Sequence, residues 1–450
     1  MIKLIERFFN LRKKKFVQDT AILQIASFFS TGLSIIGSII YARVLGVEGY
    51  ASYALIFVFA GLLELFADFG TQQGTLTLLA EAYATQNKQK IIDVLTYYVK
   101  VTVLVSVLVG LVLIAISPFL TARLYNSAEI GKLVRVIILT DIIKVFFWMY
   151  IIVLQVVRRI KRLAIIENIN KITYVVIPVS AVLFGLGLWG LVFSHLLTAG
   201  CFLIYSFVAY NILRSKEPLL PAWKEIFANW NKVQIGYYFK FGFLIAIDKN
   251  LSSLYGILPI FLLGIFSLKD VAFLKIASSY AGLPSIFLAG PVSRLLSVQL
   301  PKSKSYSLRI LKRDYIRSAL GSLLITAVIS IVFIVLSPIL VPLIYGKEYL
   351  PVVFLTYPLL IGTVFINLGV GSGPLFRTLN LMKKVIVIDL IFITLGGGII
   401  YYFVKNYPID IAIYSIALWL PIEALVTFFY LIRQLNKKIK ASREELKDEK

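Results

Sequence analysis

Long apolar stretches alternate with short polar ones along almost the whole chain. Twelve stretches of about 20 residues are predominantly apolar, the length that an α-helix needs to cross roughly 30 Å of hydrocarbon. Most are apolar on all faces, as expected for helices packed in lipid, where only helices satisfy every backbone polar group. The predicted spans are residues 18–42, 50–69, 91–116, 133–157, 164–185, 188–212, 236–262, 271–296, 318–336, 352–374, 385–403 and 409–432.

The composition also indicates a membrane protein. Hydrophobic residues make up 59% of the 450 residues and charged residues 15%, and the mean hydropathy is +0.88. The single cysteine, Cys201, excludes an internal disulfide framework and a Cys-x-x-Cys site. The single histidine, His195, excludes His-rich metal motifs, and a lone histidine in an apolar segment is usually a packed side chain. We therefore expect no metal ion and no cofactor.

The net charge of +23 follows the predicted topology. With alternate loops assigned to the cytoplasm, 32 of the 46 Lys and Arg residues lie in cytoplasmic loops and termini, and 6 lie in the opposite loops. This asymmetry places both termini in the cytoplasm of a multi-pass protein of the cell membrane. Basic clusters at 158–162 and 437–440 suit attraction to anionic lipids. No nucleic-acid partner is expected, because the chain has no basic soluble domain.

Three pairs of segments repeat in the same order at similar offsets, which indicates an internal duplication. The clearest pair is SPFLTARLYN and SPILVPLIYG, 220 positions apart, in which Pro118 and Pro338 are expected to end a span. An even number of helices per copy makes the copies parallel repeats, which predicts two six-helix lobes around a central cleft, as in alternating-access transporters. The pairs are 117–126 with 337–346, 42–59 with 261–280, and 158–167 with 379–389.

The predicted organisation has five parts. A cytoplasmic leader with basic and apolar residues at helical spacing predicts an amphipathic helix at the inner interface, with a disordered basic leader as the alternative. Two lobes follow, joined by a cytoplasmic linker, and a basic cytoplasmic tail ends the chain. In order, the parts are residues 1–17, 18–213, 214–235, 236–432 and 433–450.

The segment from Gln18 to Gly70 resembles the start of polysaccharide and oligosaccharide flippases. These belong to the multidrug/oligosaccharidyl-lipid/polysaccharide (MOP) exporter superfamily and include O-antigen flippases. ARVLG followed by GY, at 42–50, is the most specific part, and the repeated Ser-Pro phrase is also similar to the family pattern. Twelve helices in two lobes extend the resemblance over essentially the whole chain.

The resemblance implies a transporter and not an enzyme. Members move an oligosaccharide linked to a polyprenyl phosphate or pyrophosphate from the cytoplasmic to the outer leaflet, for surface polysaccharide or glycoprotein glycan synthesis. The implied partners are this anionic lipid-linked oligosaccharide and membrane lipids. Glycosyltransferases or a polymerase of the same pathway are further candidates.

Cations inside spans are candidates for binding an anionic head group, because each costs about 2.5 to 3.5 kcal/mol at a helix centre. The resemblance implies that spans one, two, seven and eight line the cleft, so the substrate-binding candidates are Arg43, Lys249 and Lys275. Lys249 is favoured because its neighbour Asp248 points about 100° away on a helix and is poorly placed to neutralise it. The alternatives are a buried ion pair for Lys249 and snorkelling to the outer surface for Lys275.

Other charged residues in the spans are spaced as pairs. Asp141 with Lys144, and Glu167 with Lys171, are three and four residues apart and can neutralise each other. Glu64 and Asp68 are four apart without a nearby cation in sequence, so they are candidates for binding a coupling cation or proton; Asp68 at a hydrated inner mouth is the alternative. Seven aromatic residues either stack on sugars or anchor the interface: Tyr41, Tyr50, Tyr53, Tyr237, Tyr238, Tyr255 and Trp148.

Two other functions remain open. A cation-coupled multidrug exporter would share the superfamily fold and would use Glu64 and Asp68, although the surplus of lysines in the spans argues against a cationic drug site. A membrane-embedded glycan polymerase or glycosyltransferase would need a large outer loop or exposed catalytic acids, whereas the longest predicted outer loops are about 15 residues. GLGLWG at 185–190 fits a dinucleotide motif, but its position between two spans predicts a tight hairpin instead.

Overall fold

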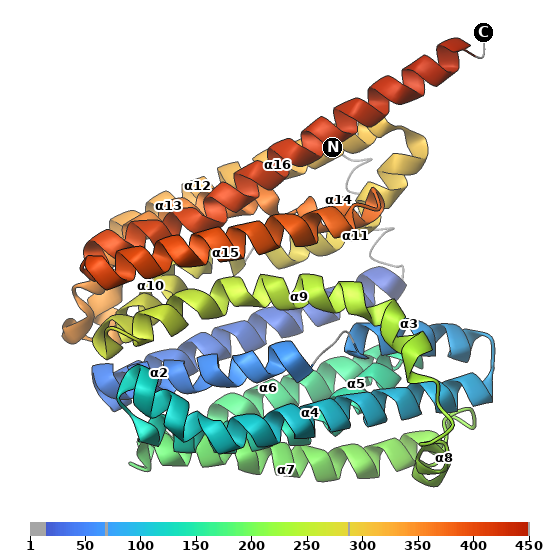
Figure 1. Ribbon diagram of the computed structural model, residues 1–450, viewed down its shortest axis with the longest axis horizontal. Coiled ribbons are helices and arrows are strands. Elements are labelled where there is room, and N and C mark those ends of the chain that lie inside the picture. Colours follow the sequence, from blue (N-terminus) through green and yellow to red (C-terminus); the bar gives the residue numbers. More distant parts are fainter. Residues whose placement is uncertain (1–14, 68–70, 287–288, 449–450) are drawn as a thin grey trace. The chain divides into compact units, whose positions relative to one another are not determined.

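The computed structural model describes residues 15–67, 71–286 and 289–448. These residues are almost entirely helical and contain no strand (Figure 1), which confirms the all-helical prediction. Within them, nine helices are long and apolar enough to cross a membrane. Each of the twelve predicted ranges coincides with helix over most of its described residues, while the count of twelve spans stays a prediction. The leader lies almost wholly outside the described residues.

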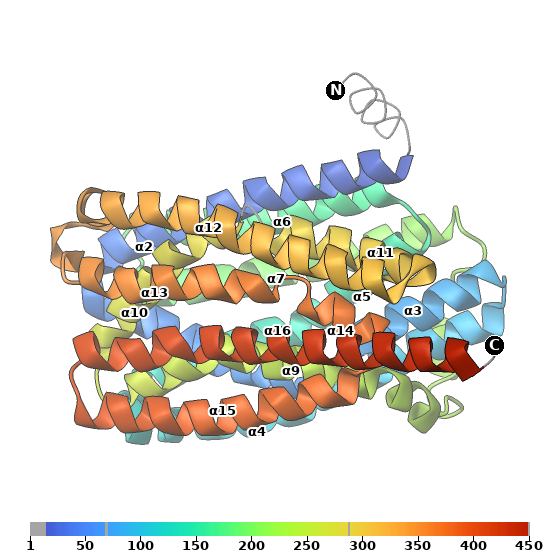
Figure 2. The same ribbon diagram turned by 90° about the horizontal axis from the view of Figure 1, so that it is seen from above.

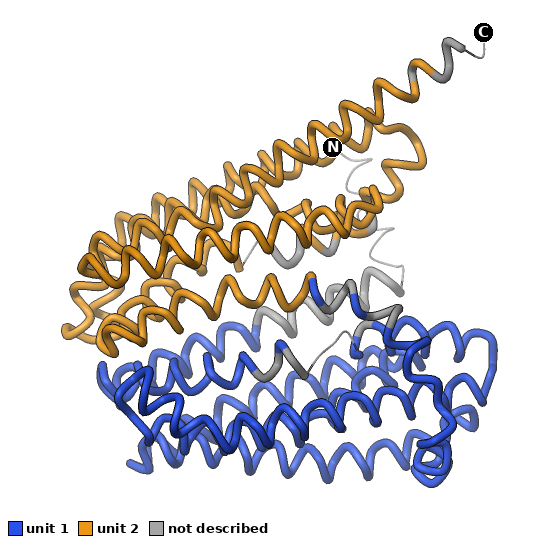
Figure 3. The backbone as a smooth tube through the Cα atoms, viewed as in Figure 1, with its two compact units in different colours: residues 1–247 blue, residues 248–450 orange. Residues whose placement is uncertain are grey.

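The chain divides into two compact units, residues 1–247 and 248–450 (Figure 3). In the first unit, buried tyrosines fill the core between α4, α5 and α7, among them Tyr98 and Tyr150, both 0% exposed. The helices of this unit are α2 (Lys15–Ala67), α3 (Thr71–Ala84), α4 (Lys88–Tyr125), α5 (Ala128–Val156), α6 (Ile160–Leu183), α7 (Gly187–Arg214), α8 (Trp223–Ala228) and the first part of α9 (Ile235–Gly264).

The second unit packs around the N-terminal half of α12 and the C-terminal half of α16. Tyr315, Phe376 and Leu435 are buried in its main hydrophobic cluster, and Figures 1 and 2 show α12, α13, α15 and α16 running alongside one another. Its elements after α9 are α10 (Leu268–Ile286), α11 (Ala289–Tyr306), α12 (Leu308–Tyr345), η1 (Lys347–Tyr349), α13 (Val352–Ile366), η2 (Asn367–Gly369), α14 (Ser372–Thr378), α15 (Met382–Asn406) and α16 (Ile409–Asp448).

Gly46 separates the first two predicted spans. Helix α2 is broken at this residue, whose backbone has φ 66° and ψ −175°. A residue with a Cβ atom is strained in this conformation, whereas glycine adopts it readily. The break explains why residues 18–42 and 50–69 read as two spans.

Both copies of the repeated phrase lie within helices. Helix α4 continues through Pro118 to Tyr125, and α12 continues through Pro338 to Tyr345. The prediction that the spans end at these prolines is therefore wrong. A proline normally disrupts a helix because it leaves the carbonyl group four residues earlier without a donor.

Other donors satisfy the two carbonyl groups that the prolines leave free. The carbonyl of Ile114 accepts a hydrogen bond from Nε of Arg135 at 2.7 Å. The carbonyl of Ile334 accepts one from the hydroxyl of Ser337 at 2.9 Å. Since no orphaned carbonyl remains at either position, both helices can continue beyond the proline.

The segment 214–235, predicted as a linker, packs closely on the first unit. Ile226 is 0% exposed, and its carbonyl accepts a hydrogen bond from Thr96 at 3.1 Å. The hydroxyl of Tyr210 donates to the carbonyl of Pro221 at 2.8 Å. Hydrogen bonds from several points along α4 and α7 therefore hold this segment in place.

Cysteine labelling tests the predicted topology. In a Cys201→Ser background, a cysteine replacing exposed Ser305 should be labelled from the cytoplasmic side, and one replacing exposed Lys347 from the outside. Ser303 is 1% exposed and donates to Asp314 at 2.7 Å, so a cysteine there should resist labelling in the folded protein and serves as a control. Labelling of positions 305 and 347 from the same side would contradict the topology.

Glu217 tests the anchoring of the 214–235 segment. Hydrogen bonds from Arg159 (2.9 Å) and Tyr83 (2.8 Å) hold the pKa of Glu217 below its ordinary value of 4.5. Its carboxylate therefore adds stability that is complete above about pH 4.5 and is lost as the pH falls through the lower folded-state pKa. Glu217→Gln should cost roughly 1 to 2 kcal/mol at pH 7, and thermal unfolding should show this difference shrinking toward pH 4. An exposed control, Glu348→Gln, should change little; an equal loss there would contradict the anchoring role.

Candidate functional site

Lys249 lies on a polar face of α9 that the surrounding helices leave uncovered. Lys249, Ser252, Ser253 and Gly256 are all exposed, and their spacing places them on one side of the helix. The serine hydroxyls donate to the backbone carbonyl groups four residues earlier, at 2.9 and 3.0 Å. These internal hydrogen bonds satisfy the hydroxyl groups when no ligand is bound, so the face can remain polar and open to a ligand.

Lys275 lies on a similar face of α10. It is partly buried, and Ser278, Ser279 and Gly282 on the same side are exposed or partly exposed. Among the described residues, none accepts a hydrogen bond from its ammonium group or forms an ion pair with it. A partly buried ammonium group without a partner is unfavourable unless an anion or water meets it, so Lys275 is well suited to bind a negatively charged group.

The two faces share one pattern, Lys-x-x-Ser-Ser-x-x-Gly, at 249–256 and 275–282. Helices α9 and α10 run in opposite directions from their connection at 265–267 (Figure 1). At 1.5 Å per residue, the serines of both copies lie about 19 Å from this connection, with Lys275 at about 14 Å and Lys249 at about 25 Å. The result is two cations at different depths with hydroxyl groups between them. This repeat was not predicted, although its 26-residue offset is visible in the chain.

The other predicted site residues belong to the first unit. Arg43 is exposed on α2, three residues before the break at Gly46, and its convergence with Lys249 and Lys275 stays a prediction. Asp68 lies outside the described residues, as does the side chain of Glu64. Their role in ion coupling is therefore a prediction as well.

One predicted ion pair is present in the first unit. The ammonium group of Lys144 lies 2.8 Å from the carboxylate of Asp141 and 4.8 Å from the ring centre of Tyr174. His195 is buried against Tyr174 and Phe57, with ring centres 5.4 and 5.1 Å apart. The prediction that His195 is a packed side chain is confirmed.

Four of the tyrosines that were candidates for sugar stacking are core residues. Tyr238 and Tyr255, 7% and 8% exposed, pack against Tyr97 and Trp419. Tyr41 and Tyr50 are 5% and 0% exposed, and both pack against Tyr53, at ring-centre distances of 5.1 and 5.6 Å. Tyr50 also shares a hydrogen bond of 2.6 Å with Ser38. Neither ring face is available to a sugar, so both proposed roles, stacking and interface anchoring, are wrong for these two residues.

A group of carboxylates inside the second unit was not predicted. Asp389, on α15, is 5% exposed, and its carboxylate accepts a hydrogen bond from Tyr255 at 3.4 Å. The carboxylates of Glu423 and Asp248 are close enough to interact electrostatically with Asp389. Arg377 offsets part of this charge through Asp248. Partly buried carboxylates that repel one another are stabilised by protonation or by a nearby positive charge. The sequence did not predict this group, because its residues, Arg377 included, come from four different helices.

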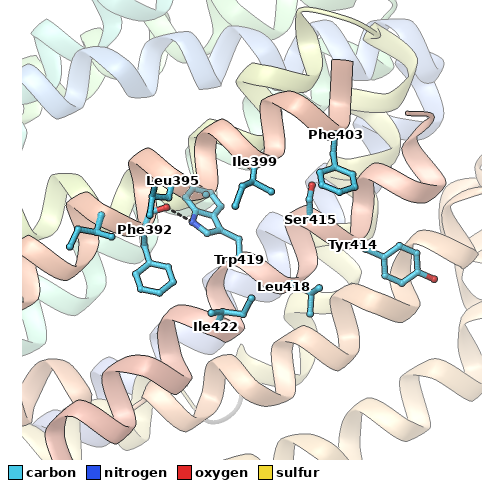
Figure 4. Close-up of a pocket in the computed structure, with 11 residues that line it drawn as sticks. Phe392, Leu395, Ile399, Phe403, Tyr414, Ser415, Leu418, Trp419 and Ile422 are labelled. Carbon is cyan, nitrogen blue, oxygen red and sulfur yellow. Dashed lines mark hydrogen bonds between the residues drawn. The ribbon is translucent and has the colours of Figure 1, made fainter. Parts of the chain in front are cut away.

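An apolar groove lies along the line where α15 packs against α16, on the surface of the second unit (Figure 4). Its volume is about 390 Å³. The indole nitrogen of Trp419 donates to the carbonyl of Phe392 at 2.8 Å across its floor. Gly396 permits this contact, because a Cβ atom there would lie 2.0 Å from the indole nitrogen. Leu395, Ile399 and Leu418 help to make the lining almost wholly apolar, so the groove suits a hydrocarbon chain.

The fold is shared with membrane transporters of known structure. An inward-facing multidrug resistance MATE family transporter of the MOP superfamily matches with a TM-score of 0.71 at 16% identity, over 92% of this chain and 99% of that chain. Lipid II flippase MurJ, in an inward closed conformation, matches with a TM-score of 0.71 at 14% identity, over 92% and 87%. A MOP superfamily transporter from Pyrococcus furiosus matches with a TM-score of 0.64 at 16% identity, over 93% and 95%. The chain therefore has the fold of MOP superfamily transporters.

The family model of polysaccharide biosynthesis proteins matches residues 40–354. This range is more than half of the chain, which therefore belongs to that family within the MOP superfamily. No curated protein matches the chain. The family resemblance read from the N-terminal segment and the repeated phrase is confirmed.

The carboxylates around Asp389 lead to a prediction about the stability of the folded protein. Asp389→Asn should unfold at the same temperature as the wild type or higher, because the amide removes repulsion while its oxygen still accepts from Tyr255. Tyr255→Phe should lower the stability by about 1 to 3 kcal/mol, because it removes the donor to a buried carboxylate. Thermal unfolding in detergent measures both. If Asp389→Asn unfolded at a lower temperature than the wild type, the Asp389 carboxylate would instead be half of a required ion pair.

Proposed function

We propose that this protein is a flippase for an oligosaccharide linked to a polyprenyl phosphate or pyrophosphate. It moves this lipid from the cytoplasmic to the outer leaflet of the cell membrane by alternating access, with both termini in the cytoplasm. The product serves surface polysaccharide or glycoprotein glycan synthesis. Membership of a polysaccharide biosynthesis family supports the substrate class, and the superfamily fold supports transport.

The repeated polar face on α9 and α10 is the observation that carries the proposal. Lys249 and Lys275 supply positive charge at two depths of the membrane, which suits a phosphate group that must pass between the leaflets. The serine hydroxyls between them can accept hydrogen bonds from sugar hydroxyl groups, or can turn away from the backbone to donate to phosphate or sugar oxygens. Arg43 is proposed as a third cation for the same head group, and Glu64 with Asp68 as candidates for ion coupling.

The apolar groove between α15 and α16 supports a lipid-linked substrate. Its lining offers almost no polar atoms to a water-soluble solute, whereas part of a polyprenyl chain would fit along it. The phosphate-binding face and the apolar groove together match the two chemical halves of the proposed substrate.

A cation-coupled multidrug exporter is the second candidate. The acidic residues Asp248, Asp389 and Glu423 favour it, because three carboxylates that influence one another, with one nearby arginine, suit a positively charged organic ligand. Among the described residues, no group of three acidic side chains is close enough together to hold a metal ion. The MATE likeness fits this candidate as well as the first. Uptake of a fluorescent organic cation into proteoliposomes would support the exporter over the flippase.

Charge substitutions at Lys249 and Lys275 test the flippase. At each position, a change to Arg should retain much of the transport, a change to Gln should lose most of it, and a change to Glu should abolish it. The reason is that a unit charge pair several ångströms apart contributes a few kcal/mol at an effective dielectric near 20. The measurement is complementation of surface-glycan synthesis, alongside the amount of protein in the membrane.

Lys269→Gln is the matched control, because Lys269 is an exposed lysine on α10 near its outer end. It should leave glycan synthesis near normal. Normal glycan with Lys249→Glu and Lys275→Glu, at normal abundance, would refute the site. Loss of glycan in step with loss of protein would indicate that the lysines serve folding.

A further inference from the structure

A basic pocket lies between the N-terminal end of α12 and the C-terminal part of α16. Its volume is about 440 Å³, and none of its five described lining residues is acidic. It is separate from the polar faces of α9 and α10 and from the apolar groove, and the proposed transport cycle does not use it. The lining residues are Arg309, Lys312, Asn436, Ile439 and Lys440.

The cations of this pocket are held near one another by the apolar core. Leu311 on α12 and Leu435 on α16 are both 0% exposed in the same hydrophobic cluster, each one residue from a residue that lines the pocket. The ammonium group of Lys312 donates to Oδ1 of Asn436 at 2.8 Å, which bridges the two helices. These contacts fix the two helices side by side, so the positive charges of Arg309, Lys312 and Lys440 stay near one another. An anion bound between them would relieve their repulsion.

The start of α12 adds to the positive potential. Ser307 caps this 38-residue helix by accepting a hydrogen bond from the backbone N–H of Arg309 at 3.1 Å. The N-terminal end of a long helix carries a partial positive charge of about half a unit, which favours an anion near the first turn. Glu444 offsets little of the charge, because its contact with Lys440 is long, at 3.8 Å, and both side chains are largely exposed.

The deep side of the pocket lies near the outer edge of the lipid head groups, and the pocket opens toward the water. Along the helix axes, Asn436 follows the predicted span 409–432 by about 6 Å and Lys312 precedes the span 318–336 by about 9 Å, while Arg309 and Lys440 lie farther out, at about 14 and 12 Å. The polar head-group layer is roughly 5 to 8 Å thick on each side of the hydrocarbon. Basic pockets between membrane helices at this depth are suited to phosphorylated head groups.

We propose that this pocket binds a phosphate group, and that its depth favours the head group of an anionic phospholipid. A soluble phosphate compound would present the same chemistry from the aqueous side. The bound anion neutralises Arg309, Lys312 and Lys440, and so stabilises the packing of the N-terminal end of α12 against the C-terminal part of α16. The site does not depend on which substrate the protein transports.

Native mass spectrometry of the purified full-length protein tests the site, with added dioleoylphosphatidylglycerol or dioleoylphosphatidylcholine. The wild type should bind the anionic lipid at least about tenfold more tightly than the zwitterionic one. The double variant Arg309→Gln/Lys312→Gln should lose about tenfold or more in affinity for the anionic lipid. Lys440→Gln, a change at a more exposed position, provides a second variant if the double variant folds poorly.

The matched control is Lys383→Gln/Lys384→Gln, which removes two exposed charges from the start of α15 and should leave anionic lipid binding unchanged. Calorimetry with sodium pyrophosphate forms the second arm. Binding of pyrophosphate that depends on Arg309 and Lys312, without preference for the anionic lipid, would support a phosphate site filled from solution. Equal loss in the control variant, or no dependence of either ligand on the pocket residues, would overturn the proposal.

Discussion

Each backbone carbonyl group that lies in hydrocarbon needs a donor from within the protein, and the fold depends on how this requirement is met. Regular α-helix meets it almost everywhere, and the exceptions show its importance. Where Pro118 and Pro338 remove a donor, Arg135 and Ser337 replace it. The two helices therefore continue for two further turns, and the repeated phrase becomes part of their C-terminal ends.

Charged groups inside the protein are arranged unevenly, and this is the basis of the functional proposals. Lys144 is neutralised by Asp141, which makes that pair structural. Lys275 has no such partner among the described residues, and Asp389 is subject to the negative charge of two further carboxylates. Charges that a protein leaves uncompensated in a membrane are costly to keep, so they are the groups for which a ligand offers the clearest physical explanation.

The predictions that failed share one cause, which is that local pattern does not report tertiary partners. Tyr41 and Tyr50 look like interface aromatics, but neighbouring rings bury them. The start of α12 and the end of α16, assigned to a cytoplasmic loop and tail, gave no sign in the sequence that both are helical and are joined by a hydrogen bond. Conversely, the Lys-x-x-Ser-Ser-x-x-Gly repeat is local and could have been found, because both copies are visible in the chain.

The sequence by itself determined the membrane class, the helical content, the approximate positions of the helices and the family, because apolar length and the phrases similar to the family are features of single segments. It also picked out Lys249 and Lys275 as charges inside spans. Only the tertiary structure decided which charges are compensated. Asp248 and Asp389, like Lys312 and Asn436, come from helices far apart in the chain and interact only because side-chain packing brings those helices together.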